Sequence, residues 1–398
     1  MRGLYYFTID QRFEDNPLLL KAVEECEEIC FCAKAPSSQW SYFRQRFAWE
    51  SLEYLKRTLE NNNNTLLILE NPLKMISLAS FDRVYICKME TAYEKEEYSL
   101  VPNELLVTMR TDRLLDSPPT PLPSTFTPFR KIVESSYTPS PFTPSPFQLG
   151  KVCSLKIKTC ESPSPTPFHP SSSYPFKGGE HQAKQRLSHY LYRDQLIEHY
   201  KETRNGLTGA DFSSKLSAYL ALGNLSPQAV YREINNFEQT VLANESTYWL
   251  KFELWWREYF RWVHDQYPHL FFLNSGIKSP TKQKAQIPNQ ELFSQWQEGK
   301  TPHPFVNAFL REFLATGYMS NRGRQITASY LVNDLQLPWK WGAQYFEDNL
   351  VDYDVYSNWG NWLYIAGVGN DPRPNRYFNP DKQQERYDPN GAFRKIWL

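Results

Sequence analysis

Three serines and a lysine gather in one short stretch of the chain. Ser213, Ser214 and Ser217 surround Lys215, and helix-like sequence follows them. Hydroxyls, backbone amides and one positive charge just before a helix suit a pyrophosphate group. The same residues also make an ordinary helix N-cap region, and taken alone they favour that interpretation.

A second polar stretch carries two carboxylates and an amide. Asp352 and Asp354 stand two positions apart, and Asn358 follows them. The surrounding residues are rich in Gly, Asn and Asp, which predicts a loop rather than the interior of a helix. Such a loop can aim carboxylates at ribose or adenine donors and an amide at a cofactor ring. A solvated turn is the alternative.

One long helical pattern, Ser246–Tyr267, places three functional side chains on one face. Glu253, Trp256 and Arg257 are three and four positions apart and therefore neighbours on a helix. A carboxylic acid in a water-poor pocket can stabilise a negative charge that develops beside it. A surface ion pair and a core tryptophan are the plainer alternative.

The first third of the chain is expected to supply a scaffold. Short apolar runs alternate there with helical patterns such as Trp40–Leu59. This alternation predicts a Rossmann-like parallel α/β domain. The chain lacks a G-x-G-x-x-G sequence and a Walker loop, which argues against an enzyme that uses NAD or ATP. The runs expected to form strands are Leu4–Ile9, Ile29–Ala33, Thr65–Leu69, Arg83–Cys87 and Glu104–Met109.

Serine-proline and threonine-proline units then dominate residues 117–175. Proline fixes φ and removes a donor, so we expect an extended tether on the surface, with the helix-compatible Phe129–Glu134 embedded in it. A phosphorylated, disordered segment is the alternative. The predicted domains are an α/β domain over 1–135, a linker over 136–177 and an all-helical domain over 178–398. The further helical patterns in the all-helical domain are Val306–Ala315, Arg322–Asn333 and Lys340–Leu350.

The length and composition of the chain narrow the class of protein to which it can belong. The 398 residues suffice for two domains, and 44 basic against 44 acidic side chains give no reason to expect a polyanionic partner. Aromatic residues make up 16% and include 12 Trp, which fits a large core or stacking on a flat cofactor. The six cysteines lack zinc-like spacing, so we expect no metal site. Without a signal or membrane-spanning stretch, we expect a cytoplasmic protein without a membrane partner.

Three long stretches resemble the photolyase and cryptochrome family, and most closely its cryptochrome DASH branch. The resemblance implies a blue-light-absorbing flavoprotein with one FAD in the helical domain. The first stretch combines 200–207 with 211–223, the second is 316–325, and the third is 352–362, continued by 367–373 and 378–380.

The resemblance implies a role in FAD binding for many of these residues. Asp352 is expected to pair with Arg324 beside the flavin ring, and Asn358 to face its N5 atom. Plant cryptochromes carry Asp where this chain has Asn358, whereas photolyases and DASH proteins resemble the Asn. The complete implied set is Tyr200, Arg204, Ser213, Ser214, Lys215, Leu216, Ser217, Arg257, Asn321, Arg324, Asp352, Asp354 and Asn358.

A second implied set concerns catalysis. By resemblance to photolyases, Glu253 hydrogen-bonds a damaged pyrimidine pair and Trp256 stacks on it. Asn321 and Gln325 line the same pocket, with Tyr364 where many photolyases carry Trp. The branch that repairs (6-4) photoproducts has histidines around this motif, and here Ser320, Asn321 and Gln325 take their places, so that chemistry is not expected.

The resemblance also implies a chain of tryptophans that passes electrons to the flavin. Trp362 is expected near the ring and Trp339 farther out. By ungapped counting, the third position is Gln286, which puts conventional photoreduction in doubt. Trp341, Trp296 or a tyrosine could substitute.

The leading hypothesis is a deoxyribodipyrimidine photo-lyase activity that splits cyclobutane pyrimidine dimers, preferentially in single-stranded DNA. The alternatives are a blue-light photoreceptor without repair and a pigment-binding relic with neither activity. Most DASH proteins also hold a folate antenna, methenyltetrahydrofolate, in the cleft between domains. Glu253, Trp256 and Asn358 favour repair, whereas the shortened first domain, Gln286 and Asn307 favour divergence. Pro302 and Asn307 are the two departures from the family sequence in 301–308. We expect a monomer.

Overall fold

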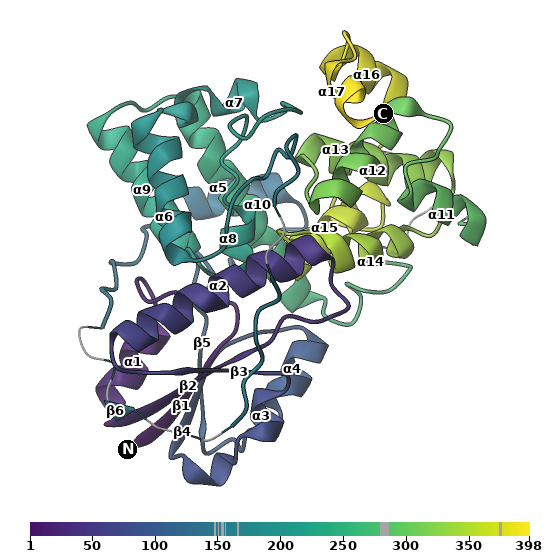
Figure 1. The fold of residues 1–398 in the computed structure, drawn as a ribbon. Helices are drawn as coiled ribbons and strands as arrows, with labels where there is room; N and C mark the ends of the chain where they lie inside the picture. Colours follow the sequence, from purple (N-terminus) through teal and green to yellow (C-terminus); the bar gives the residue numbers. More distant parts are fainter. Residues whose placement is uncertain are drawn as a thin grey trace.

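The computed structural model describes residues 1–146, 149, 151–152, 155, 157–164, 167–278, 286–373 and 376–398. A parallel sheet with flanking helices forms the first part of the chain, and a helical part lies against it (Figure 1). Helix α2 (Tyr42–Asn61) runs between the two. The predicted fold class, α/β followed by all-α, is confirmed.

Every strand of the sheet is parallel to its neighbours, in the order β3-β2-β1-β4-β5, and β6 pairs with β2. Helices cross over between successive strands, as parallel pairing requires. The predicted strands are confirmed to within three residues at each end. They are β1 (Arg2–Phe7), β2 (Glu28–Lys34), β3 (Leu66–Leu69), β4 (Arg83–Cys87) and β5 (Leu106–Met109). The short strand β6 (Lys151–Val152) was not predicted and lies in the segment expected to be a linker.

Short helices complete the first part, and the helical part follows. The helices around the sheet are α1 (Pro17–Glu25), α2, α3 (Pro72–Met75), η1 (Leu78–Ser80) and α4 (Ala92–Tyr98). The helices of the second part are α5 (Phe126–Glu134), α6 (Glu180–Ser188), η2 (His189–Arg193), η3 (Leu196–His199), α7 (Tyr200–Thr203), α8 (Ser217–Leu222), α9 (Pro227–Thr240), α10 (Glu245–Gln266), α11 (Gln290–Gln297), α12 (Pro304–Thr316), α13 (Asn321–Ser329), η4 (Tyr330–Asp334), α14 (Trp339–Asn349), α15 (Val355–Ile365), α16 (Pro380–Tyr387) and α17 (Ala392–Trp397).

Helix α10 is the centre of the helical part and packs against α5, α7, α9 and α15. A capping box starts it, because Asn244 accepts from the Thr247 backbone amide while the Thr247 hydroxyl accepts from that of Asn244. Buried aromatic residues such as Trp255 and Tyr259 fix it in the core. The predicted helix Ser246–Tyr267 is therefore confirmed.

The loop predicted around Asn358 is wrong, because Asn358 lies in the first turn of α15. The Asp354 side chain accepts a hydrogen bond from the Ser357 backbone amide at 2.8 Å and caps the helix. Trp359, Trp362 and Leu363 bury the apolar side of α15. This packing outweighs the low helix propensity of Gly and Asn.

The proline-rich tether is fastened rather than free. Phe126, Phe129 and Val133 of α5 belong to the core of the helical part. Farther along, the Asp15 backbone amide donates to the Thr143 carbonyl at 2.7 Å, and the Thr143 amide donates to the Asp15 side-chain carboxylate at 3.3 Å. The predicted domain limits 1–135, 136–177 and 178–398 stay predictions, and the packing of α5 favours an earlier end to the first domain.

Buried polar contacts join the two parts. The Glu180 carboxylate accepts from the backbone amides of Phe13 and Glu14 at 2.8 and 3.1 Å. The guanidinium of Arg12 donates to the Gly223 carbonyl at 3.1 Å. These bonds satisfy buried groups on both sides and fix the parts relative to each other. In the described part of the chain, none of the helices is long and apolar enough to cross a membrane.

Candidate functional site

Two adjoining cavities in the helical part collect most of the predicted site residues. The larger encloses about 1220 Å³ of empty space and the smaller about 530 Å³, and they share Asn321, Arg324, Asp352 and Asp354. The larger is also lined by Tyr200, Arg204, Ser213, Ser214, Lys215, Leu216, Ser217, Glu253, Trp256 and Arg257. The smaller adds Gln325, Asn358 and Trp362. Tyr364 and Trp339 line neither.

The serine-rich segment forms one end of the larger cavity. Lys215 is buried, and its φ of 59° lies in the left-handed region that non-glycine residues seldom adopt. Arg186 holds the segment from behind, donating to the carbonyls of Ser213 and Ser214 at 3.0 and 2.9 Å. Arg186 was missed from the sequence, because its neighbours in α6 give no sign of this contact.

Arg324 and Asp352 form the predicted ion pair. The Arg324 Nη2 atom lies 2.8 Å from each carboxylate oxygen of Asp352, and Arg324 Nε donates to the Met319 carbonyl at 2.9 Å. The Asp352 side chain is only 4% exposed, whereas that of Arg324 is 24% exposed, so the carboxylate is buried and the guanidinium is partly open to the cavity. The guanidinium is thereby held in one orientation at the junction of the two cavities.

Asp354 belongs to a charge network that extends into the first part. Arg261 contacts Asp354 on one side and donates to Asp112, 2.9 Å away, on the other. Although burial acts to raise the pKa values of both carboxyls, Arg261 beside them lowers these pKa values. Arg261 and Asp112 were missed, although the position of Arg261 one turn after Arg257 on α10 was a signal.

Arg257 and Asn358 are oriented by backbone carbonyls. Arg257 donates to the carbonyls of Asp112 and Leu220 at 2.7 and 3.1 Å. Asn358 Nδ2 donates to the Ala343 carbonyl at 3.0 Å, which fixes the amide plane. Within the described residues, the Gln325 Oε1 atom is buried without a hydrogen-bond partner, as expected of an acceptor that awaits a ligand.

The structure brings Glu253 and Arg204 together, with Arg204 Nη1 2.5 Å from Glu253 Oε1. Burial raises the pKa of Glu253, and Arg204 opposes this shift only in part. Both residues line the larger cavity. A carboxyl that holds its proton more tightly than usual therefore faces the cavity.

Trp256 is stacked on Phe126, with ring centroids 3.8 Å apart and planes at 13°. Phe126 comes from α5 and was missed, because the sequence placed it inside a tether. Tyr364 lies edge-on to Trp256 at 5.8 Å, and its hydroxyl accepts from Arg376 at 2.6 Å. Trp256 thus has one ring face covered and its edge near Tyr364.

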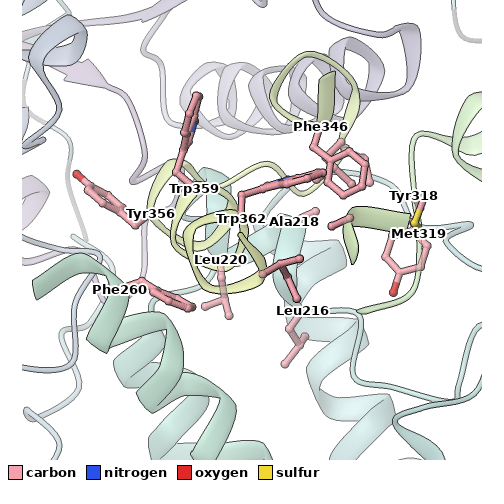
Figure 2. Packing of buried hydrophobic residues seen from close by; sticks show 14 of the residues in the cluster. Leu216, Ala218, Leu220, Phe260, Tyr318, Met319, Phe346, Tyr356, Trp359 and Trp362 are labelled. Carbon is pink, nitrogen blue, oxygen red and sulfur yellow. The ribbon is translucent and has the colours of Figure 1, made fainter. Parts of the chain in front are cut away.

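The two predicted electron-transfer tryptophans occupy different environments. Trp362 extends from α15 toward Phe346, with ring centroids 5.2 Å apart (Figure 2). Trp339 is fully buried on α14 and lies 5.7 Å from Trp359, centroid to centroid. Trp359, which was missed, points from another side of α15 in Figure 2. Gln286 is half-buried.

The chemistry of these cavities fits FAD. Lys215 and the serine hydroxyls supply a cation and donors for a diphosphate. Carboxylates at the junction can accept from ribose or adenine, and Trp362 with Phe346 gives an apolar wall beside a flat ring. Asn358 and Arg324 then lie where a flavin ring needs polar partners.

Comparison with known proteins gives the same picture. Residues 3–92 match the family model described as DNA photolyase, and residues 249–398 match that of the FAD binding domain of DNA photolyase. A cryptochrome DASH of Vibrio parahaemolyticus is 39% identical, over 99% of this chain and 93% of that protein. One of Danio rerio is 38% identical, over 98% of this chain and 81% of that protein.

Solved structures agree. A Synechocystis cryptochrome has a TM-score of 0.92 at 35% identity, over 100% of this chain and 89% of the other. A class III photolyase from Agrobacterium tumefaciens has a TM-score of 0.85 at 25% identity, over 100% and 86%. The chain therefore belongs to the photolyase and cryptochrome family, in its cryptochrome DASH branch, and its helical part is an FAD-binding domain.

Proposed function

We propose that this chain repairs cyclobutane pyrimidine dimers in single-stranded DNA with blue light, as a deoxyribodipyrimidine photo-lyase. One observation carries the proposal. Glu253 and Trp256, suited to a pyrimidine pair, line the same cavity as Arg324 and Asp352, suited to the flavin. Substrate and cofactor would therefore meet in one enclosed space.

Reduced FAD, when bound, supplies the light-driven electron that opens the dimer. The protein binds, orients and excludes water. Arg324 and Asp352 would hold the ring end, with Asn358, Asn321 and Arg257 by the flavin. Asp354 would accept from ribose or adenine donors. Tyr200, Arg204 and the segment Ser213–Ser217 would hold the diphosphate.

Glu253 would stabilise the negative charge that reaches the dimer. In the structure, Glu253 pairs with Arg204. Burial raises the pKa of Glu253 and so favours its protonated form, which would donate a hydrogen bond to a pyrimidine carbonyl. Trp256 would offer its free face to one base, and Asn321, Gln325 and Tyr364 would complete the pocket. The unpartnered Oε1 of Gln325 suits a donor on the flavin or the base.

Single-stranded substrate is favoured by the limited stacking that the pocket offers. Phe126 covers one face of Trp256, and Phe260 lies 5.4 Å from the ring centre at 34°, so at most one face can stack on a base. Stacking of a base on an aromatic ring contributes about 1 to 3 kcal/mol, whereas flipping a base out of a duplex costs a few kcal/mol. The net charge of zero adds no strong attraction to the backbone.

The test is to illuminate reduced protein with a dimer-containing single-stranded oligonucleotide and to follow the return of thymine absorbance. Light-dependent recovery with turnover supports repair. No recovery by protein that carries reduced FAD would leave the alternative, a photoreceptor that reports light through conformational change. We further propose that the protein acts as a cytoplasmic monomer.

An antenna pigment has a candidate cleft between the two parts. It encloses about 2330 Å³ and is lined at the carboxyl ends of β1 and β2 by residues that include Thr8, Gln11 and Lys34. Among the described residues, Thr8 Oγ1 and Gln11 Oε1 are buried without partners, which fits a polar ligand. We infer that a folate such as methenyltetrahydrofolate binds here, and the test is its retention and near-ultraviolet absorbance after reconstitution.

A further inference from the structure

A buried titratable cluster lies behind the proposed diphosphate site. Lys215 Nζ donates to the Tyr318 hydroxyl at 2.9 Å and lies 3.4 Å from the centre of the Phe212 ring. Within the described residues, Lys215 forms no ion pair within 4 Å. A lysine enclosed mainly by aromatic rings lacks the counter-charge that a buried ammonium normally requires.

Glu312 of α12 is the second buried member of the cluster. Its Oε1 atom accepts from the Ser173 hydroxyl at 2.5 Å, and its Oε2 atom is buried with no hydrogen-bond partner among the described residues. Burial raises the pKa of Glu312 to about 7, although Ser173, Lys215 and Arg324 act against this shift. A carboxyl in this state holds a proton near neutral pH.

The end of the proline-rich tether builds the back wall of the cluster. Tyr174 stacks on Tyr318 with ring centroids 5.0 Å apart, and its hydroxyl donates to the Lys215 carbonyl at 3.4 Å. Ser173 adds the bond to Glu312. The tether thus closes the cluster from water on the side away from the cavity.

The groups that face Lys215 come from three helices and one loop. Arg186 of α6 and Arg324 of α13 act against its positive charge, whereas Glu312 and Asp352 favour it. Burial is the largest influence, and the pKa of Lys215 lies well below its ordinary value. Asp352 is already paired with Arg324, which compensates most of its negative charge.

We propose that FAD loading in this chain is proton-coupled, and that the Lys215–Glu312 cluster takes up a proton as the cofactor's diphosphate enters the cavity. The inference rests on the proposed diphosphate site. The diphosphate would supply the counter-charge that Lys215 lacks, so the protonated lysine becomes the favoured form. Glu312 does not line the cavity but interacts electrostatically with Lys215. The negative charge of the diphosphate would also favour the neutral, protonated form of Glu312, so both changes have the same sign.

The direction of the pH dependence follows by linkage. The FAD-bound form holds more protons than the FAD-free form at pH values above the pKa of Lys215 in the empty site. FAD affinity should therefore fall as the pH rises, by roughly tenfold per pH unit where one full proton is taken up. A site built from permanent charges alone would show no such slope near neutral pH.

The experiment is calorimetric titration of the full-length apoprotein with FAD near neutral pH, in buffers of different ionisation enthalpy. The observed heat should change with the buffer in the sense of proton uptake by the protein. Buffer-independent heats with normal FAD binding would overturn the inference but leave the proposed site standing. Failure to bind FAD at all would overturn both.

Substitutions of Lys215 and Glu312 test which side chain takes up the proton. Lys215→Met should weaken FAD binding and remove most of the proton uptake. Glu312→Gln should keep FAD binding, and any proton uptake that remains should be that of Lys215. Lys300→Met is the matched control, because Lys300 is 66% exposed and paired with Glu298 on the surface. Undiminished uptake in both cluster variants would overturn the assignment.

Discussion

Arg204 and Glu253 form an ion pair across the larger cavity, with 2.5 Å between Nη1 and Oε1. The resemblance assigns Arg204 to the cofactor and Glu253 to the substrate. One contact therefore links the two proposed binding regions. Arg204 also lies over the rings of Tyr200 and Trp249, 5.7 and 5.1 Å from their centres, so the pair is held on several sides.

Glu253→Gln tests the proposed anion stabiliser. The amide keeps the size and hydrogen bonding of the side chain but removes the ionisable proton, so we expect near-normal FAD content and a repair rate reduced roughly tenfold or more. Wild-type repair should decline as the pH rises through the raised pKa of Glu253, because the proton is then lost. The variant should be slow at every pH. Equal rates in variant and wild type would exclude this role.

Asp352→Ala and Arg324→Ala test the cofactor site. Arg324→Ala leaves the buried Asp352 carboxylate unpaired, at a cost of about 3 to 5 kcal/mol, and Asp352→Ala removes the partner that orients the partly exposed Arg324. We therefore expect purified variants that lack the yellow colour. The measurement is FAD released per protein chain, with folding checked by circular dichroism. Glu298→Ala, which removes an exposed surface partner of Lys300, should keep its FAD. Full FAD content in both site variants would show that the pair does not hold the ring.

The strands could be predicted from local pattern. Long motifs pointed to residues that the structure brings together around two cavities, and their roles stay predictions. β4 was predicted as Arg83–Cys87 and begins and ends there, since a buried parallel strand is a short apolar run bounded by turns. Asn358 was predicted in a loop, because composition does not reveal the cap by Asp354 or the aromatic packing of α15. Phe126 and Arg186 were missed for the same reason: their partners are distant in the sequence.

Phe126→Leu tests whether α5 shapes the substrate pocket. Leucine keeps apolar volume but loses the stacking on Trp256, so we expect a loss of roughly 1 kcal/mol in the free energy of unfolding. Trp256 would then be held less firmly, and affinity for a dimer-containing oligonucleotide should fall several-fold, as measured by fluorescence anisotropy. Phe142→Leu, at a side chain that is 54% exposed, is the control. Unchanged affinity for the oligonucleotide would show that the stacking by α5 does not contribute to substrate binding.

Electron supply gives a further prediction. If Gln286 stands where relatives have the outermost tryptophan, light-driven reduction of bound, oxidised FAD should be slow even with an external thiol. Trp362→Phe should abolish what remains, and Gln286→Trp should accelerate it, while chemically pre-reduced protein still acts on substrate. Loss of the oxidised absorbance under blue light is the readout.

The outcome that would contradict this placement is rapid reduction in the wild type that survives Trp339→Phe. The ungapped position of Gln286 would then be abandoned. Trp359, whose ring centre is 5.7 Å from that of Trp339, makes Trp359→Phe the next variant to measure.

The Asp112–Arg261–Asp354 network predicts acid sensitivity. Both aspartates have a lowered pKa in the folded protein, because Arg261 outweighs the effect of burial. Their stabilisation is therefore present above the unfolded value of about 4 and is lost as the pH falls through the folded values. Arg261→Met should cost about 3 to 5 kcal/mol at pH 7, and urea unfolding should show the difference from wild type shrinking below about pH 4. A difference that does not depend on pH would contradict the network.

The most direct test of the central claim is blue-light repair by the reduced protein, measured as dimers opened per FAD, on one dimer sequence offered as single strand and as duplex. We predict repeated turnover on the single strand, much slower repair of the duplex and no repair in the dark. The absence of light-dependent opening on either substrate, in protein shown to carry reduced FAD, would contradict the account.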